Sequence, residues 1–155
     1  MTRVEIVRLP HAADLPLPSY ATEGSAGLDL IAAVGAEVEL KPGARVCVPC
    51  GIALALPAGF EAQVRPRSGL ALNHGVTVLN APGTIDSDYR GEVKATLVNH
   101  GEAPFRIARG MKIAQLVVAR HETVELYEVG ELPASERGAG GFGSTGLQIA
   151  AKRTA

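Results

Sequence analysis

The sequence predicts an all-β fold, a sandwich or a barrel, with one short helix. Turn signals rich in Gly and Pro recur at short intervals, and the runs between them are short and rich in Val, Ile and Leu. Many short strands with such regular turns are typical of sandwiches and barrels rather than of alternating strand–helix units. Aromatic residues make up 4% of the chain and Trp is absent, so we expect an aliphatic core.

Each predicted strand is a short apolar run bounded by a turn. The turn tripeptides are KPG, PAG, APG and NHG, and NHG occurs twice. The expected strands span residues 4–9, 36–40, 44–49, 51–56, 75–79, 93–98 and 112–118. The helix is expected at 68–75, because Leu70, Ala71 and His74 would share one face. Residues 80–92, with a turn at Ala81–Gly83, are expected to form a hairpin.

Length and charge narrow the class of protein. A chain of 155 residues with 46% hydrophobic residues is expected to form one domain with a real core. The formal net charge is −1 and no basic run is present, which disfavours a nucleic-acid polymer as partner. A small phosphorylated ligand needs only a few local cations and stays possible.

The N-terminal segment, residues 1–18, is interrupted by charges and prolines and has no apolar stretch of secretory length. We therefore expect neither a signal peptide nor a membrane span, and a cytoplasmic protein. Cys47 and Cys50 form CVPC between two strand-like runs, not the strand–helix setting of a redox dithiol. A zinc site needs about four ligands, so we interpret both as reduced packing residues.

The glycine-rich stretch RGAGGFGSTG, residues 137–146, contains a literal G-x-G-x-x-G. A dinucleotide fingerprint requires a strand before it and a helix after it, and a phosphate loop requires Lys where Gly143 stands. Neither motif is complete. We expect a β domain over residues 1–136 and a flexible C-terminal arm over 137–155.

The segment PRSGLA combines a helix start with a cation. The N-terminus of a helix offers free N–H groups, and Arg67 and the Ser68 hydroxyl add donors, so the segment can bind an anion. A capped helix with a solvated arginine would give the same pattern.

Three further segments place polar residues within apolar runs. Asp86 follows Ile85 and is expected inside a strand, where a carboxylate is costly unless it is used. Asp86 and Asp88 have the spacing of a metal pair, although Asp88 also fits an exposed turn. Asp29 in GLDL and Gln115 in KIAQLVV interrupt strands in the same way.

In order and spacing, the segments 25–30, 66–71, 80–92, 109–116 and 137–146 resemble the five conserved segments of the homotrimeric dUTP pyrophosphatases (dUTPases). The resemblance implies a β jelly roll and a homotrimer with active sites between subunits. It also implies hydrolysis of dUTP to dUMP and diphosphate, which lowers dUTP and supplies dUMP for thymidylate synthesis. Three departures, at Ile31, Cys50 and Ala139, remove no expected catalytic group.

The resemblance also assigns roles to residues. Asp86 would be the base that activates water, Tyr89 would stack on the sugar, and Asp29 would hold Mg²⁺ through water. The Asn80 amide and nearby backbone groups would bind uracil. The remaining substrate-binding candidates are Arg67, Ser68, Gly69, Gly83, Thr84, Ile85, Lys94, Gln115, Arg137, Phe142, Gly143 and Ser144.

Two alternatives stay open from the sequence. A dCTP deaminase of the same superfamily would share the fold, but PRSGLA is without the further serine and arginine typical of its equivalent loop, and its catalytic glutamate has no clear counterpart. A non-catalytic trimeric binding protein would explain the β pattern but not five intact polar segments.

Overall fold

The computed structural model describes residues 2–144. The chain divides into two units, Met1–Thr123 and Val124–Ala155, and every strand and helix of residues 2–144 lies in the first. Among the described residues, no helix is long and apolar enough to cross a membrane.

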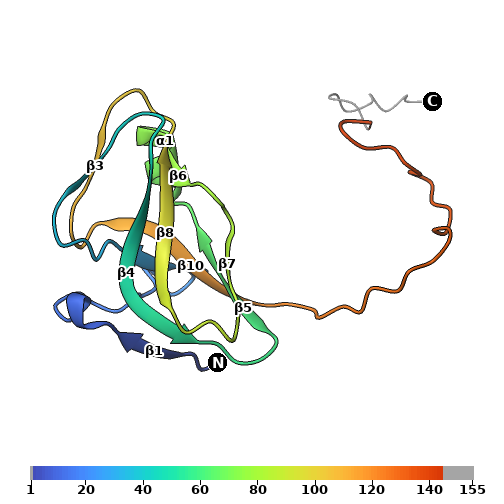
Figure 1. Cartoon of the computed structure of the whole chain (residues 1–155), viewed down its shortest axis with the longest axis horizontal. Coiled ribbons are helices and arrows are strands. Elements are labelled where there is room, and N and C mark those ends of the chain that lie inside the picture. Colours follow the sequence, from blue (N-terminus) through green and yellow to red (C-terminus); the bar gives the residue numbers. More distant parts are fainter. Residues whose placement is uncertain (1, 145–155) are drawn as a thin grey trace. The chain divides into compact units, whose positions relative to one another are not determined.

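The first unit is built from antiparallel sheets, as the sequence predicts (Figure 1). One four-stranded sheet has the order β1-β4-β8-β6, the other has the order β2-β10-β5-β7, and β3 pairs with β9. The strands are β1 (Glu5–Arg8), β2 (Leu28–Ile31), β3 (Val38–Leu40), β4 (Arg45–Ala55), β5 (Phe60–Arg65), β6 (Val76–Val78), β7 (Gly83–Ile85), β8 (Glu92–Asn99), β9 (Phe105–Ile107) and β10 (Lys112–Arg120). The sheets stay open, so the sandwich alternative is confirmed and the barrel is not.

Strand pairing in this unit is entirely non-sequential. Among the described residues, no two strands that are consecutive in the chain pair with each other. The hairpin expected at 80–92 is therefore wrong. β6 before the Ala81–Gly83 turn pairs with β8, and β7 after it pairs with β5 in the other sheet. The turn carries the chain from one sheet to the other, because β6 pairs with the longer strand β8 and β7 pairs with the longer strand β5.

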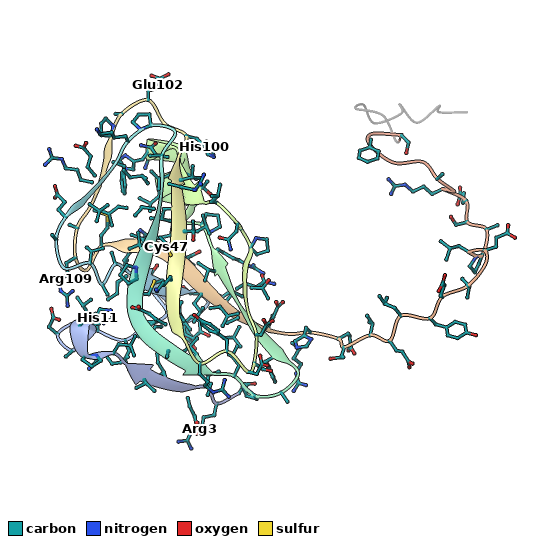
Figure 2. All side chains as sticks on the ribbon, viewed as in Figure 1. Arg3, His11, Cys47, His100, Glu102 and Arg109 are labelled. Atoms are coloured by element: carbon teal, nitrogen blue, oxygen red, sulfur yellow. The ribbon has the colours of Figure 1, made fainter. Side chains whose placement is uncertain are left out.

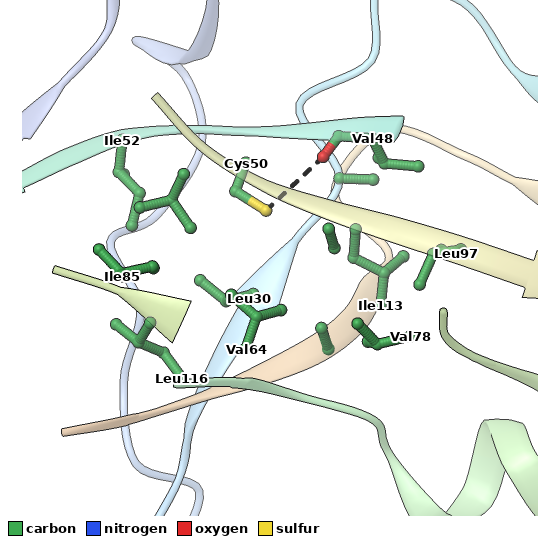
Figure 3. Packing of buried hydrophobic residues seen from close by; sticks show 14 of the residues in the cluster. Leu30, Val48, Cys50, Ile52, Val64, Val78, Ile85, Leu97, Ile113 and Leu116 are labelled. Carbon is green, nitrogen blue, oxygen red and sulfur yellow. Dashed lines mark hydrogen bonds between the residues drawn. The ribbon is translucent and has the colours of Figure 1, made fainter. Parts of the chain in front are cut away.

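The core is aliphatic, as composition predicts. Both four-stranded sheets contribute to one cluster, in which Leu30, Val64 and Leu116 pack with Val48 and Leu97 (Figure 3). All five side chains are at most 4% exposed. Burying each such side chain contributes about 1.5–3 kcal/mol to folding.

β4 is a single strand where the sequence suggested two, at 44–49 and 51–56. The register against β8 shifts between Pro49 and Ala53, which marks a bulge around Gly51. Gly51 has φ +69°, and a Cβ there would lie 2.1 Å from the Cβ of Ala12. Glycine is required for this backbone and for the close approach of the 3₁₀ turn η1 (Pro10–Ala12).

The short helix is confirmed as α1 (Ser68–His74). Arg67 is its N-cap in extended conformation, and the Ser68 side chain does not cap it. The helix ends at Gly75 in the left-handed region. Only Pro66 and Arg67 separate the end of β5 from the first residue of the helix.

Both cysteines are free, but only Cys50 packs in the core; Cys47 is exposed (Figure 2). Burial, together with the Glu92 carboxylate, raises the pKa of the Cys50 thiol to about 12.

We expect iodoacetamide at pH 8 to label Cys47 and to spare Cys50 while the protein is folded, because the thiolate is the reactive form. Mass spectrometry of peptides checks this, and equal labelling of both residues would contradict it.

Candidate active site

A cavity of about 190 Å³ lies where β7, the loop after it and the start of β8 meet. Val64 of β5 and Thr96 of β8 contribute to its wall. The candidate residues from the third polar segment line it together: Asn80, Gly83, Thr84, Ile85, Asp86, Tyr89 and Lys94. The structure therefore gathers this part of the predicted site in one place.

The cavity wall mixes fixed backbone with polar side chains. Gly83 and Ile85 are buried on β7, held by pairing of Gly83 with Val64 and of Ile85 with Ala62. Asn80 and Thr84 are exposed beside them. Fixed donors and acceptors of this kind can read the edge of a planar ring, because a mismatched ring leaves polar groups unpaired.

Asp86 does not lie inside a strand, which corrects the expectation from sequence. β7 ends at Ile85, and Asp86 is the first residue of the loop and is exposed. Within residues 2–144 its carboxylate makes no hydrogen bond or ion pair, and the residue lines the cavity. Asp88 is exposed in the following turn, as expected for a surface residue.

Tyr89 lies across the backbone of the same loop. Its hydroxyl donates a hydrogen bond of 3.1 Å to the Glu92 carbonyl oxygen. A Cβ on Gly91 would lie 2.3 Å from the Tyr89 hydroxyl oxygen, so only glycine lets the ring take this position. The side chain lines the cavity and is 46% exposed.

A second group of charged side chains, here named the cation cluster, consists of Asp29, Arg67 and Lys112. Asp29 is buried on β2, its Oδ2 is 2.7 Å from Lys112 Nζ, and its Oδ1 is 3.6 Å from Arg67 Nε. Arg67 Nη1 donates to the Lys112 carbonyl oxygen at 2.9 Å. Gln115 is the register partner of Asp29 across β2 and β10. Two cations thus lie beside one buried carboxylate, and Gln115 stands opposite it on the neighbouring strand.

Ser68 and Gly69 are the exposed first residues of α1, beside this cluster in sequence. A Cβ on Gly69 would meet no described atom within 4 Å. Nothing within the described chain therefore requires glycine at position 69.

The two parts of the predicted site are separate in one chain. Among residues 2–144, the lining of the cavity includes none of Asp29, Arg67, Ser68, Gly69 and Gln115. A groove of about 430 Å³, lined in part by Arg65, Pro82 and Gln115, lies between the Ala81–Pro82 turn and β10.

The arm candidates lie in the second unit. Arg137 Nε donates to the Gly140 carbonyl oxygen at 2.7 Å. Phe142 is fully exposed with φ +49°, and Gly143 has φ +91°. Ser144 donates its backbone N–H to Gly141. Thr145 and Gly146, the end of the motif, lie outside the described residues.

Sequence reasoning missed two residues, Glu92 and Lys112. Glu92 lines the cavity and Lys112 pairs with Asp29. Lys112 stands three residues before Gln115 in the polar segment 109–116. A lysine at the start of that predicted strand could have indicated a cation near the phosphate site.

The fold and the site define a β protein with a small cavity lined by strand backbone and a few polar side chains, which is the usual form of a small-ligand site. The model of the dUTPase family matches residues 13–146. The chain therefore belongs to the dUTPase family.

Similar proteins agree with this assignment. A deoxyuridine 5'-triphosphate nucleotidohydrolase of Methylocella silvestris is 60% identical over 92% of this chain and 91% of its own. One of Rhizobium rhizogenes is 55% identical over 93% of this chain and 94% of its own.

A solved structure shares the fold. The dUTPase of Staphylococcus bacteriophage 80alpha with dUpNHpp has a TM-score of 0.85 and 25% identity, covering 95% of this chain and all of that one. None of these findings favours the deaminase or the non-catalytic alternative.

Proposed function

We infer that the protein hydrolyses dUTP to dUMP and diphosphate. The observation that carries this is the match of the dUTPase family over residues 13–146, which span the cavity and the cation cluster. The reaction lowers dUTP and supplies dUMP for thymidylate synthesis, and we propose that it takes place in the cytoplasm, where nucleoside triphosphates are used.

We propose that the 190 Å³ cavity binds deoxyuridine. Asn80 and the backbone of Gly83, Thr84 and Ile85 pair with the uracil edge, and the tight strand backbone excludes a thymine methyl. Tyr89 stacks on the sugar and crowds a 2′-hydroxyl. Lys94 at the wall contacts the nucleotide.

The triphosphate is bound by Arg67 of the cation cluster, by residues near it and by the arm. Arg67, Ser68, Gly69 and Gln115 offer a forked cation, a hydroxyl, backbone N–H and an amide to the phosphate oxygens. In the arm, Arg137, Phe142, Gly143 and Ser144 contact the terminal phosphates and the base.

A homotrimer with sites between subunits follows from this division of roles. The separation of cavity and cluster within one chain supports it, because a neighbouring subunit can bring the second part of the site to the first. The open space beside Gly69 fits a ligand or a neighbouring chain at that position.

Asp29 suits Mg²⁺ only through water. An ion bound directly to Oδ2 of Asp29 would displace Lys112, and one bound to Oδ1 would lie beside the Arg67 guanidinium, whereas a water-mediated contact leaves both pairs in place. Among residues 2–144, no group of three or more His, Cys, Asp or Glu could hold a metal, so the phosphates supply the other ligands. One dUTPase of phage phi11, with 21% identity and a TM-score of 0.74, is described with a structural Mg(II) ion. When bound, Mg²⁺ neutralises phosphate charge.

The chemical step needs one base from this chain. The Asp86 carboxylate accepts a proton from water, whose oxygen forms a bond to the α-phosphorus. The bond from the α-phosphorus to the bridging oxygen breaks, and diphosphate leaves with the electron pair. Arg67, Ser68 and Arg137 stabilise the charge that develops on the phosphates.

A nucleotide panel tests the function. With Mg²⁺ present, kcat/KM for diphosphate release from dUTP should exceed that for dTTP, dCTP and UTP by about 10²–10⁵-fold, because each rival adds or exchanges a group that the cavity excludes. A parallel assay with chelator should lower turnover of dUTP. Comparable kcat/KM for any rival nucleotide would refute the uracil cavity, and ammonia release from dCTP would indicate the deaminase.

A further inference from the structure

Glu92 is a cavity residue with an unusually well-anchored side chain. One oxygen, Oε1, accepts two hydrogen bonds of 2.9 Å, from the Gly51 backbone N–H and from His11 Nε2. The side chain is 17% exposed. It therefore ties the first residue of β8 to the bulge of β4 and to the η1 turn.

The η1 turn is also held by the side chain of Arg109. Arg109 Nη2 donates to the His11 carbonyl oxygen at 2.7 Å and Arg109 Nη1 donates to the Val34 carbonyl at 3.1 Å. Arg109 also binds the Asp14 carboxylate, and this hydrogen bond lowers the pKa of Asp14. Figure 2 shows His11 and Arg109 on neighbouring segments at one side of the first unit. The Leu9 N–H donates to the Gly51 carbonyl oxygen at 2.8 Å, so both the N–H and the carbonyl of Gly51 are hydrogen-bonded.

Glu92 connects this anchor to the sugar side of the cavity. Its backbone carbonyl accepts the Tyr89 hydroxyl, whose ring lies over Gly91. The Tyr89 hydroxyl is thus bonded to the carbonyl of a residue whose side chain is held by two other segments, the bulge of β4 and the η1 turn.

We propose that Glu92, held by His11 and Gly51, is a positioning residue that sets the place of Tyr89 and so the preference for deoxyribose over ribose. The proposal rests on the role of Tyr89 given above. Removing the Glu92 side chain leaves the Gly51 N–H without its acceptor and releases the start of β8. The ring then has room to move, and a 2′-hydroxyl meets less resistance.

The test compares kcat/KM for dUTP and UTP in variants of the full chain. In Glu92→Ala the dUTP/UTP ratio should fall about tenfold, the equivalent of one lost hydrogen bond. The change should appear in KM, lower for UTP because its 2′-hydroxyl is better tolerated and higher for dUTP because the stack on the sugar loosens, with kcat less affected because Asp86 stays in place. Glu92→Gln keeps an acceptor for Gly51 and His11 and should restore most of the ratio. His11→Ala, which removes one bond and keeps Glu92, should give an intermediate ratio and covers the case in which Glu92→Ala fails to fold.

Two controls separate the outcomes. Glu37→Ala removes an exposed pair with Arg106 elsewhere on the fold and should leave the ratio unchanged. Tyr89→Phe, which lacks the hydroxyl, should lower the ratio as Glu92→Ala does. If the wild type itself fails to prefer dUTP, the proposed role of Tyr89 is wrong. If the wild type prefers dUTP and His11→Ala and folded Glu92→Ala keep that preference, the positioning role of Glu92 is overturned.

Discussion

Asp86→Asn is expected to lower kcat for dUTP by about 10²–10⁴-fold, the usual contribution of a general base. The amide keeps the shape of the carboxylate but cannot take the proton from water. Because the side chain is exposed and makes no bond within residues 2–144, the substitution should leave the fold and the affinity for dUTP nearly unchanged. Rapid-quench measurement of turnover and calorimetric titration with dUTP check the two parts separately.

The matched control is Asp88→Asn, two residues further along the same loop. Asp88 is exposed in the turn and is absent from the cavity wall, so its variant should keep wild-type kcat. Near-normal turnover in Asp86→Asn would remove Asp86 from the role of base. Equal losses in both variants would point to the loop's charge instead.

Ending the chain after Glu136 is expected to leave the folded β unit intact and to lower turnover of dUTP severely. The last strand that the structure describes ends at Arg120, and residues 137–144 contribute no strand to the sheets. The deletion removes the Arg137 contact to phosphate, about 1.5–3 kcal/mol, and the Phe142 stack on the base, about 1–3 kcal/mol. Together these correspond to a loss of about 10²-fold or more in kcat/KM.

Phe142→Ala separates the two contributions. Only the stack is lost, so this variant should retain more activity than the truncated chain while keeping the same thermal midpoint. Steady-state kinetics on both variants, with circular dichroism to confirm folding, makes the comparison. Full activity in the truncated chain would show that the arm takes no part in the reaction.

The fold was predictable where apolar runs alternate with strong turns. The runs at 93–98 and 112–118 became β8 and β10, because each has enough Val, Ile and Leu to bury residues in the core. The run at 4–9 became β1, whose four residues are all exposed and which pairs with β4 at the edge of its sheet. β5, Phe60–Arg65, escaped prediction, since Glu61, Gln63 and Arg65 make it look polar. Its buried Ala62 and Val64 alternate with those polar residues, the pattern of a half-buried strand.

The site was predictable where a motif keeps its residues contiguous. Asn80, Asp86 and Tyr89 lie within one loop region, and the structure places them around one cavity. Glu92 and Lys112 could not be assigned in this way, because their partners are distant in sequence. Glu92 contacts Gly51 and His11, and Lys112 contacts Asp29, and these contacts are seen in the folded structure.

The non-sequential pairing of the strands bears on how the chain folds. A protein in which neighbouring strands form hairpins can start from a local contact, whereas here every ladder must first close a loop that contains other strands. β2 and β10 are paired although most of the core strands lie between them in the chain. With such a high contact order, the chain loses conformational entropy before the stabilising contacts form. Domains of this kind therefore fold in milliseconds to seconds. The same topology makes the native ladders cooperative, because no strand can leave its sheet without opening a long loop.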